Sequence, residues 1–140
     1  MKRIFLTLIF VLSFVSVVSA QLPLINLDGS LKYKDLKVGK GEEALSGKVL
    51  VVDYSGWILK SNGNRGVKFD SSYDAGRRFE FRLGAGDVIK GWDEGVVGMH
   101  VGGIRELRIP SKLAYGSQSI GKKIPPSSNL IFEIELLEVK

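Results

Sequence analysis

Cysteine is absent from this 140-residue chain, and histidine occurs once, as His100. Without cysteine the chain can form neither disulfides nor a Cys–His catalytic pair, and one histidine cannot supply the set of imidazole ligands common in zinc sites. The sequence also has neither the Gly-x-Ser-x-Gly motif of serine hydrolases nor a Walker-type phosphate-binding loop. If the protein is an enzyme, we therefore expect it to use no metal, no cofactor and no covalent nucleophile.

A strong excess of one charge is also missing, since the chain has 20 basic and 15 acidic residues. The basic residues are spread along the sequence and do not form a stripe with interleaved aromatics, the pattern expected of nucleic-acid-binding proteins. We expect an ordinary solvated surface and no nucleic-acid partner.

A long apolar run occurs only at the N-terminus. Lys2 and Arg3 precede an almost continuously apolar stretch at 4–18, and small residues end it at Ala20, before Gln21. This pattern is typical of a cleaved secretory signal peptide. A membrane anchor is the alternative, but a run of about 15 residues is shorter than the roughly 20 that span a bilayer. We predict a signal peptide at 1–20 and a mature protein that is periplasmic or secreted and not attached to the membrane. Since no Lys-Asp-Glu-Leu-type retention signal ends the chain, we favour a bacterial envelope.

The mature chain is predicted to be rich in strands. Alternation of apolar and polar residues, with β-branched and aromatic enrichment, indicates strands at 31–38, 48–58, 78–83, 104–109 and 130–139, with a short extended piece at 67–70. Residues 21–31 have no lasting periodicity and predict a loose lead-in. The long segment 111–129 has glycines and prolines, and loops of this length are usually functional or disordered.

A glycine-rich segment at 84–99 predicts the single helix. Its apolar residues fall at roughly helical spacing: Val88, Ile89, Trp92, Val96 and Met99. Asp87 is a candidate N-cap, and Asp93 is expected to face solvent. We expect this short helix to lie on a sheet with Trp92 at the contact. The fold class is thus α+β, with about five antiparallel strands and one helix. We divide the chain into the signal peptide, a lead-in with the first strand at 21–45, and one domain at 46–140.

Six blocks of sequence, in a fixed order, resemble the FKBP-type peptidyl-prolyl cis-trans isomerases. They are residues 51–56, 68–72, 79–84, 88–96, 114–116, and 124–126 with 130–137. The resemblance covers roughly 46–140. It implies a twisted antiparallel sheet wrapped around one short helix, and a single-domain isomerase that accelerates rotation about X-Pro bonds during protein folding. Together with the predicted signal peptide, it indicates an exported isomerase.

The resemblance also implies roles for individual residues. Trp92 would form the floor of a pocket for the substrate proline, with Ile124 closing it from the loop side. The walls would come from Tyr54, Phe69, Phe79, Val88, Ile89 and Phe132. As catalytic groups it implies the Ile89 backbone N–H as a donor to a substrate carbonyl, the Tyr115 hydroxyl as a second hydrogen-bonding group, and Asp70 beside Tyr54 at the rim. Expected partners are proline-containing polypeptides and macrolide inhibitors of the rapamycin type, bound by a monomer.

Two alternatives stay open. The aromatic residues Phe79, Phe81, Trp92 and Phe132 could be ordinary core, and Phe81 is the one for which core packing is most expected. The protein could also be a proline-peptide-binding module or folding chaperone with little isomerase activity. The chain departs from familiar family members at Leu113, at Ile120 and at the basic pair Lys122 and Lys123. These departures fall on the rim and loop, where they would affect substrate preference.

Overall fold

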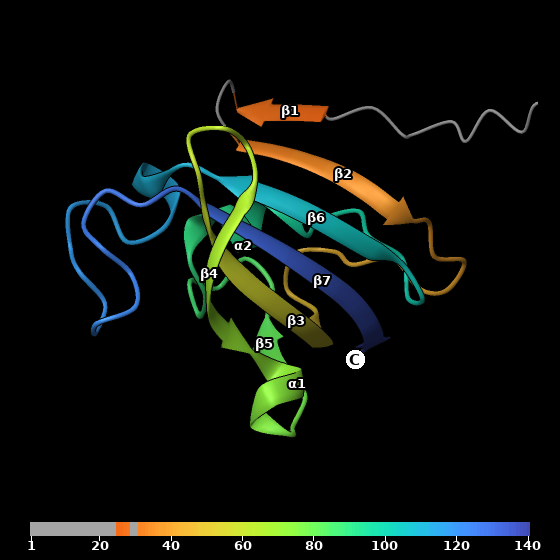
Figure 1. Cartoon of the computed structure of the whole chain (residues 1–140). Coiled ribbons are helices and arrows are strands. Elements are labelled where there is room, and N and C mark those ends of the chain that lie inside the picture. Colours follow the sequence, from red (N-terminus) through yellow and green to blue (C-terminus); the bar gives the residue numbers. More distant parts are fainter. Residues whose placement is uncertain (1–24, 29–30) are drawn as a thin grey trace, which may run out of the picture.

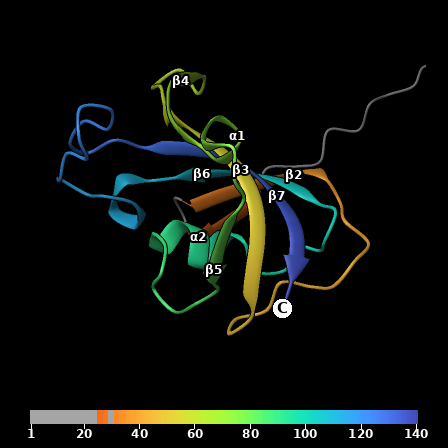
Figure 2. The same cartoon turned by 90° about the horizontal axis from the view of Figure 1, so that it is seen from below.

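The structure, a computed structural model, describes residues 25–28 and 31–140, with side chains from residue 31 onward. The predicted signal peptide lies outside these residues. The described chain forms a seven-stranded antiparallel sheet with short helices, shown in Figures 1 and 2. The strands are β1 (Ile25–Asp28), β2 (Leu31–Lys37), β3 (Val49–Leu59), β4 (Arg65–Ser71), β5 (Phe79–Arg82), β6 (Ile104–Ile109) and β7 (Leu130–Val139). The helices are α1 (Ser72–Ala75), α2 (Lys90–Gly95) and the 3₁₀ turn η1 (Ser111–Leu113).

The prediction of an antiparallel α+β fold is confirmed, with more strands than expected. The strands follow the order β1-β2-β6-β7-β3-β4, and β5 also pairs with β3. The expectation of a loose lead-in is wrong at 25–28, where β1 pairs with β2. A four-residue alternation is too short to stand out in the sequence, but an edge strand needs only a neighbouring backbone to pair with. The sheet therefore continues across the domain boundary placed at residue 46.

Strand β3 has two different partners along one edge, and this division shapes the site. Its first half pairs with β5, from Val49 to Val52, and its second half pairs with β4, from Ser55 onward. Tyr54 lies between the two pairings, and its backbone N–H donates instead to the Ser72 hydroxyl at 2.8 Å. The chain thus leaves β4, turns through α1 and returns as β5 beside Tyr54.

Helix α2 lies against one face of the sheet (Figure 1), and two glycines let it approach closely. A Cβ atom on Gly91 would collide with the Ile109 side chain, and one on Gly95 would lie 2.8 Å from Leu107. Glycine weakens an isolated helix by about 1 kcal/mol relative to alanine. Here the absence of side chains allows β6 to support the helix and to fix the position of Trp92.

The start of α2 differs from the prediction. Ile89 is the N-cap residue and no side chain caps the helix. Asp87 instead accepts a hydrogen bond from the Arg82 backbone N–H at 3.2 Å. Asp93 also differs from the prediction, because its carboxylate accepts from the N–H groups of Gly84 (2.8 Å) and Gly86 (3.0 Å). Both carboxylates accept from backbone N–H groups at 82–86, before the helix, a local competition that a helical pattern does not reveal.

The predicted loop at 111–129 is a loop held at several points. It begins with η1, the Ser111 N–H donates to the Asn129 side chain at 3.0 Å, and the Ser127 N–H donates to the Gly116 carbonyl at 2.8 Å. None of the helices described here has both the length and the apolar character needed to cross a bilayer. Residues 31–140 also contain no cluster of three or more potential metal-ligating side chains.

Candidate active site

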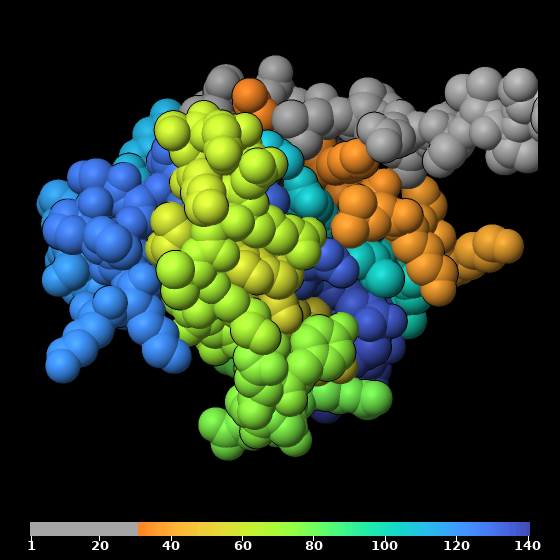
Figure 3. Space-filling view, in the orientation of Figure 1, coloured from red at the N-terminus to blue at the C-terminus, as the bar shows by residue number. Residues whose placement is uncertain are grey.

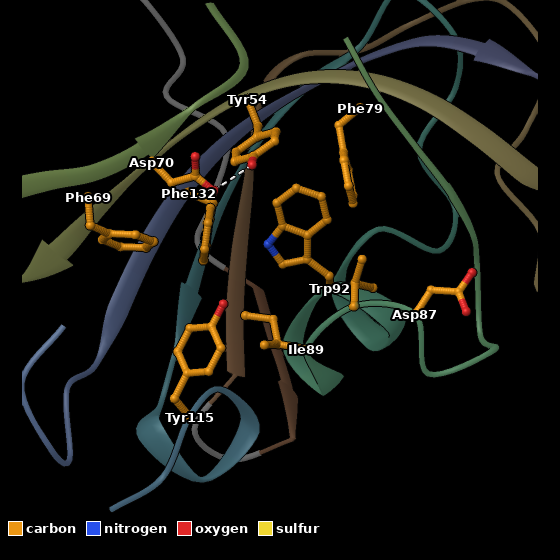
Figure 4. A pocket seen from close by; sticks show the side chains of 10 residues that line it. Tyr54, Phe69, Asp70, Phe79, Asp87, Ile89, Trp92, Tyr115 and Phe132 are labelled. Carbon is orange, nitrogen blue, oxygen red and sulfur yellow. Dashed lines mark hydrogen bonds between the residues drawn. The ribbon is translucent and has the colours of Figure 1, made fainter. Parts of the chain in front are cut away.

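A cavity of about 330 Å³ opens beside α2 (Figure 4). Its lining residues come from β3, β4, β5, β7, α2 with the segment before it, and the loop after η1. They are Tyr54, Phe69, Asp70, Phe79, Asp87, Val88, Ile89, Trp92, Tyr115 and Phe132. Six of the ten side chains are aromatic, two are aliphatic and two are aspartates, so the cavity is largely apolar.

Trp92 forms the floor of the cavity. Its indole is 4% exposed and meets the rings of Tyr54 and Phe132 edge to face, with centroids 4.9 and 5.2 Å away. The indole Nε1 is buried and has no hydrogen-bond partner among the described residues. Figure 4 shows the nitrogen-bearing edge turned toward Phe132, whose ring face is only a weak acceptor. Trp92 is thus buried by its neighbours and still borders the open cavity, so the core and pocket interpretations both apply to it.

Gly56 makes room for two wall residues. A Cβ atom at this position on β3 would lie 2.7 Å from the Phe132 ring and 2.8 Å from the Phe69 ring. These rings meet at 88° with centroids 5.5 Å apart. Because β3 presents no side chain here, both rings can pack over the strand and form one side of the cavity.

A hydrogen-bonded pair forms the polar rim. The Tyr54 hydroxyl donates to Asp70 Oδ2 at 2.6 Å, and Asp70 Oδ1 accepts from the Ser71 N–H at 2.9 Å. Burial, reinforced by the hydrogen bond and charge of Asp70, raises the pKa of Tyr54 well above its ordinary value. Burial also raises the pKa of Tyr115, with a smaller contribution from the Asp70 charge. Both phenols therefore remain neutral hydroxyl groups at physiological pH.

Two hydrogen-bond donors of cavity-lining residues have no partner among the described residues. The Tyr115 hydroxyl makes no hydrogen bond to any described residue, and Figure 4 shows it pointing into the cavity. Ile89 has an extended backbone (φ −57°, ψ 150°) just before α2, and its N–H has no acceptor within residues 25–28 and 31–140. The site therefore combines an apolar floor and walls with two donors that a bound carbonyl could satisfy.

Comparison with known proteins agrees with this geometry. The sequence model of a family described as FKBP-type peptidyl-prolyl cis-trans isomerase matches residues 40–137. The chain belongs to this family. It is therefore a peptidyl-prolyl cis-trans isomerase, as the sequence predicted.

Individual FKBP relatives resemble most of the chain. A protein of Neisseria meningitidis named FK506-binding protein is 50% identical over 111 residues, which cover 79% of this chain and 97% of the relative. The Saccharomyces cerevisiae protein Peptidyl-prolyl cis-trans isomerase FPR2 is 50% identical over 98 residues, 70% of each chain. The crystal structure of AtFKBP13 superposes with a TM-score of 0.73 at 40% identity and covers 84% of this chain and 99% of its own.

The structure of this FKBP places nine of the ten predicted site residues around the cavity. Ile124 is the exception, because it borders a neighbouring hollow and is 4% exposed. Phe81 is core, as expected: it is 4% exposed and stacks behind Phe79 with centroids 5.7 Å apart. Asp87 also lines the cavity and was not among the predicted site residues, although its position directly before Val88 and Ile89 was a signal. The catalytic roles of Tyr115, Asp70 and Ile89 stay predictions.

Proposed function

We propose that this isomerase accelerates X-Pro isomerisation in proteins that fold after export. The support is the N-terminal sequence, in which two basic residues, an apolar stretch and small residues at 18–20 have the order of a cleaved signal peptide. Cleavage after Ala20 would release a periplasmic or secreted protein that begins at Gln21. N-terminal sequencing of the protein recovered from the envelope fraction tests this proposal, and recovery of an uncleaved chain in the cytoplasm or membrane would contradict it.

The proposed mechanism uses the cavity to favour a twisted amide. Rotation about an X-Pro bond faces a barrier of about 20 kcal/mol, because resonance keeps the amide planar. The planar amide is more polar than the twisted one, since resonance places negative charge on oxygen and double-bond character in C–N. An apolar, water-poor pocket therefore disfavours the planar ground state relative to the twisted state.

One observation carries the mechanism: an aromatic cavity contains two donors that have no partner among the described residues. The proline ring would lie on the Trp92 indole, with the Ile89 N–H and the Tyr115 hydroxyl within reach of substrate carbonyls. Asp70 accepts from Tyr54 and so acts as a positioning residue for the rim. Fixed donors of this kind can stabilise a transition state without reorganising during the reaction.

The same cavity suits macrolide ligands of the rapamycin type, since several relatives are named for binding FK506. We further propose that the protein acts as a monomer on proline-containing polypeptides, with no nucleic-acid or membrane partner after cleavage. An exchange NMR experiment on a proline peptide tests the catalytic proposal. Residues 21–140 should accelerate cis–trans exchange, and rapamycin should abolish the acceleration. Peptide binding without faster exchange would instead favour a binding module or chaperone.

A further inference from the structure

A second hollow, of about 350 Å³, lies next to the prolyl cavity. The two share Phe69, Asp70 and Tyr115. The rest of its lining comes from residues 120–124 of the loop between β6 and β7, which Figure 3 shows in blue beside β4. A peptide extended at about 3.3 Å per residue can therefore continue from the prolyl cavity past Tyr115 into this second hollow.

The second hollow has an apolar base and a basic rim. Ile124 and Phe69 are 4% and 9% exposed, whereas Lys122 and Lys123 are exposed. Neither lysine forms an ion pair with another residue of the described chain. Both ammonium groups are therefore available to a substrate.

The backbone fixes the position of this basic pair. Ile120 and Ile124 exchange two backbone hydrogen bonds, at 3.1 and 3.3 Å, and so close a turn with the two lysines near its tip. Gly121 adopts a φ of 57°, the left-handed conformation that glycine accepts readily. The charges are thus presented by a closed turn.

Asp70 limits where a substrate carboxylate can lie. It is the one acidic residue lining the second hollow, and it lies at the junction with the prolyl cavity. Its two oxygens already accept from the Tyr54 hydroxyl and the Ser71 N–H. A substrate carboxylate at the junction would be repelled, whereas one further along the hollow would approach the two ammonium groups.

We propose that Lys122 and Lys123 make this isomerase prefer substrates with glutamate or aspartate on one flank of the proline, the flank that enters the second hollow. This inference rests on the proposed function, because it requires the proline to occupy the first cavity. Since the preference depends on the path of the peptide, it differs from a general attraction between a basic protein and an acidic peptide, which would act on both flanks.

The test measures kcat/KM by exchange NMR for peptides with one proline. Each peptide has Glu, Gln or Lys at one of the two positions before or after the proline. At low salt we expect Glu to exceed Lys by about three- to tenfold on one flank, as suits exposed ion pairs. The ratio should approach one at about 1 M NaCl, where the Debye length is about 3 Å. The double variant Lys122→Glu/Lys123→Glu should reverse the order of Glu and Lys.

The matched control is Lys37→Glu/Lys40→Glu, which changes the net charge equally at two exposed lysines remote from the second hollow. The control should keep the wild-type order. The inference is overturned by equal rates for Glu and Lys peptides, by the same preference on both flanks, or by an equal shift in the control. If the Gln peptides bind but show no catalysed exchange, the proposed function fails. The inference is then tested separately by NMR titration, in which the Glu peptide should bind with a lower Kd than the Lys peptide on one flank only.

Discussion

The two ends of helix α2 satisfy their polar groups in opposite ways. At the N-terminal end, the Ile89 N–H and the Trp92 Nε1 have no partner among the described residues, and both belong to residues that border the cavity. At the C-terminal end, Arg105 donates to the carbonyls of Gly95 and Val97 at 2.9 and 3.0 Å. The helix has only six residues, yet the donors at its N-terminal end are unpaired while the backbone acceptors at its C-terminal end are paired.

The Arg105 end is built for stability. The guanidinium is 5% exposed, forms two hydrogen bonds to the Asp35 carboxylate at 2.7 and 3.3 Å, and lies 4.0 Å from the Tyr33 ring centroid. It thereby joins β2, β6 and the end of α2. The two ends of α2 thus differ: one has unpaired donors on residues that border the cavity, and the other is joined to β2 and β6.

The largest expected effect comes from removing the hydrogen bonds of Arg105 at the C-terminal end of α2, which we call the paired end. Arg105→Leu would leave the Asp35 carboxylate and two carbonyls without their donor, so we expect a loss of about 3–5 kcal/mol in the free energy of unfolding. Urea denaturation at pH 7 measures the loss. The molecules that remain folded should keep most of their kcat/KM, because Arg105 does not line the cavity.

Asp35→Asn is the matched partner variant. The variant keeps an acceptor for Arg105 and removes only the negative charge. Because the Asp35 side chain is also more exposed than that of Arg105, we expect a smaller loss of unfolding free energy than for Arg105→Leu. If Arg105→Leu lowered stability by less than about 1 kcal/mol, the paired end would not be what holds α2.

The next largest effect comes from changing Trp92, the floor of the cavity, at the N-terminal end of α2, which we call the open end. Trp92→Leu keeps an apolar side chain but removes the flat indole, so we expect kcat/KM to fall about ten- to hundredfold, or about 1.4–2.7 kcal/mol. Phe81→Leu is the control, because Phe81 contacts Trp92 with centroids 5.6 Å apart but lies outside the cavity lining. Both variants should lose stability, and only Trp92→Leu should lose most of its activity. Equal activity losses would make Trp92 a core residue without a distinct role.

A smaller effect concerns the rim beside the floor. Tyr54→Phe removes the hydrogen bond to Asp70, so we expect a loss of about 0.5–1.5 kcal/mol in unfolding free energy at neutral pH. The pKa of Tyr54 is raised in the folded protein, so its contribution is fully present below the ordinary pKa of about 10 and is lost as pH rises toward the folded pKa. The stability difference between wild type and variant should therefore be constant from pH 7 to 9 and shrink above pH 10. Urea midpoints across this range measure it, and a constant difference at pH 11 would contradict it.

The residues at the open end of α2 could be predicted from the sequence, whereas the contacts at the paired end could not. The open-end residues lie in short blocks, such as 88–96, whose order identifies the family. The strand at 104–109 was predicted, but not that Arg105 is buried on the same face as Leu107 and Ile109. Its acceptors come from β2 and the end of α2, and no local pattern reports contacts between segments so far apart. Asp93 was missed for a different, local reason: its carboxylate accepts from the turn at 84–86, which the helical pattern of apolar residues does not report.

The smallest expected effect separates a free donor from a paired one. Tyr115→Phe removes a hydroxyl that has no partner among the described residues, so the unfolding free energy should stay within about 0.5 kcal/mol of wild type. A hydrogen bond to substrate is worth about 0.5–1.5 kcal/mol, so kcat/KM should fall about two- to tenfold. A fall in kcat at constant KM would show that the hydroxyl contacts the twisted amide more strongly than the planar one.

Tyr73→Phe is the control for Tyr115→Phe. The Tyr73 hydroxyl donates to Glu135 at 3.3 Å outside the cavity, so its loss should leave kcat/KM unchanged. If Tyr115→Phe also left kcat/KM unchanged, the Ile89 N–H would remain as the one free donor assigned to the substrate carbonyl.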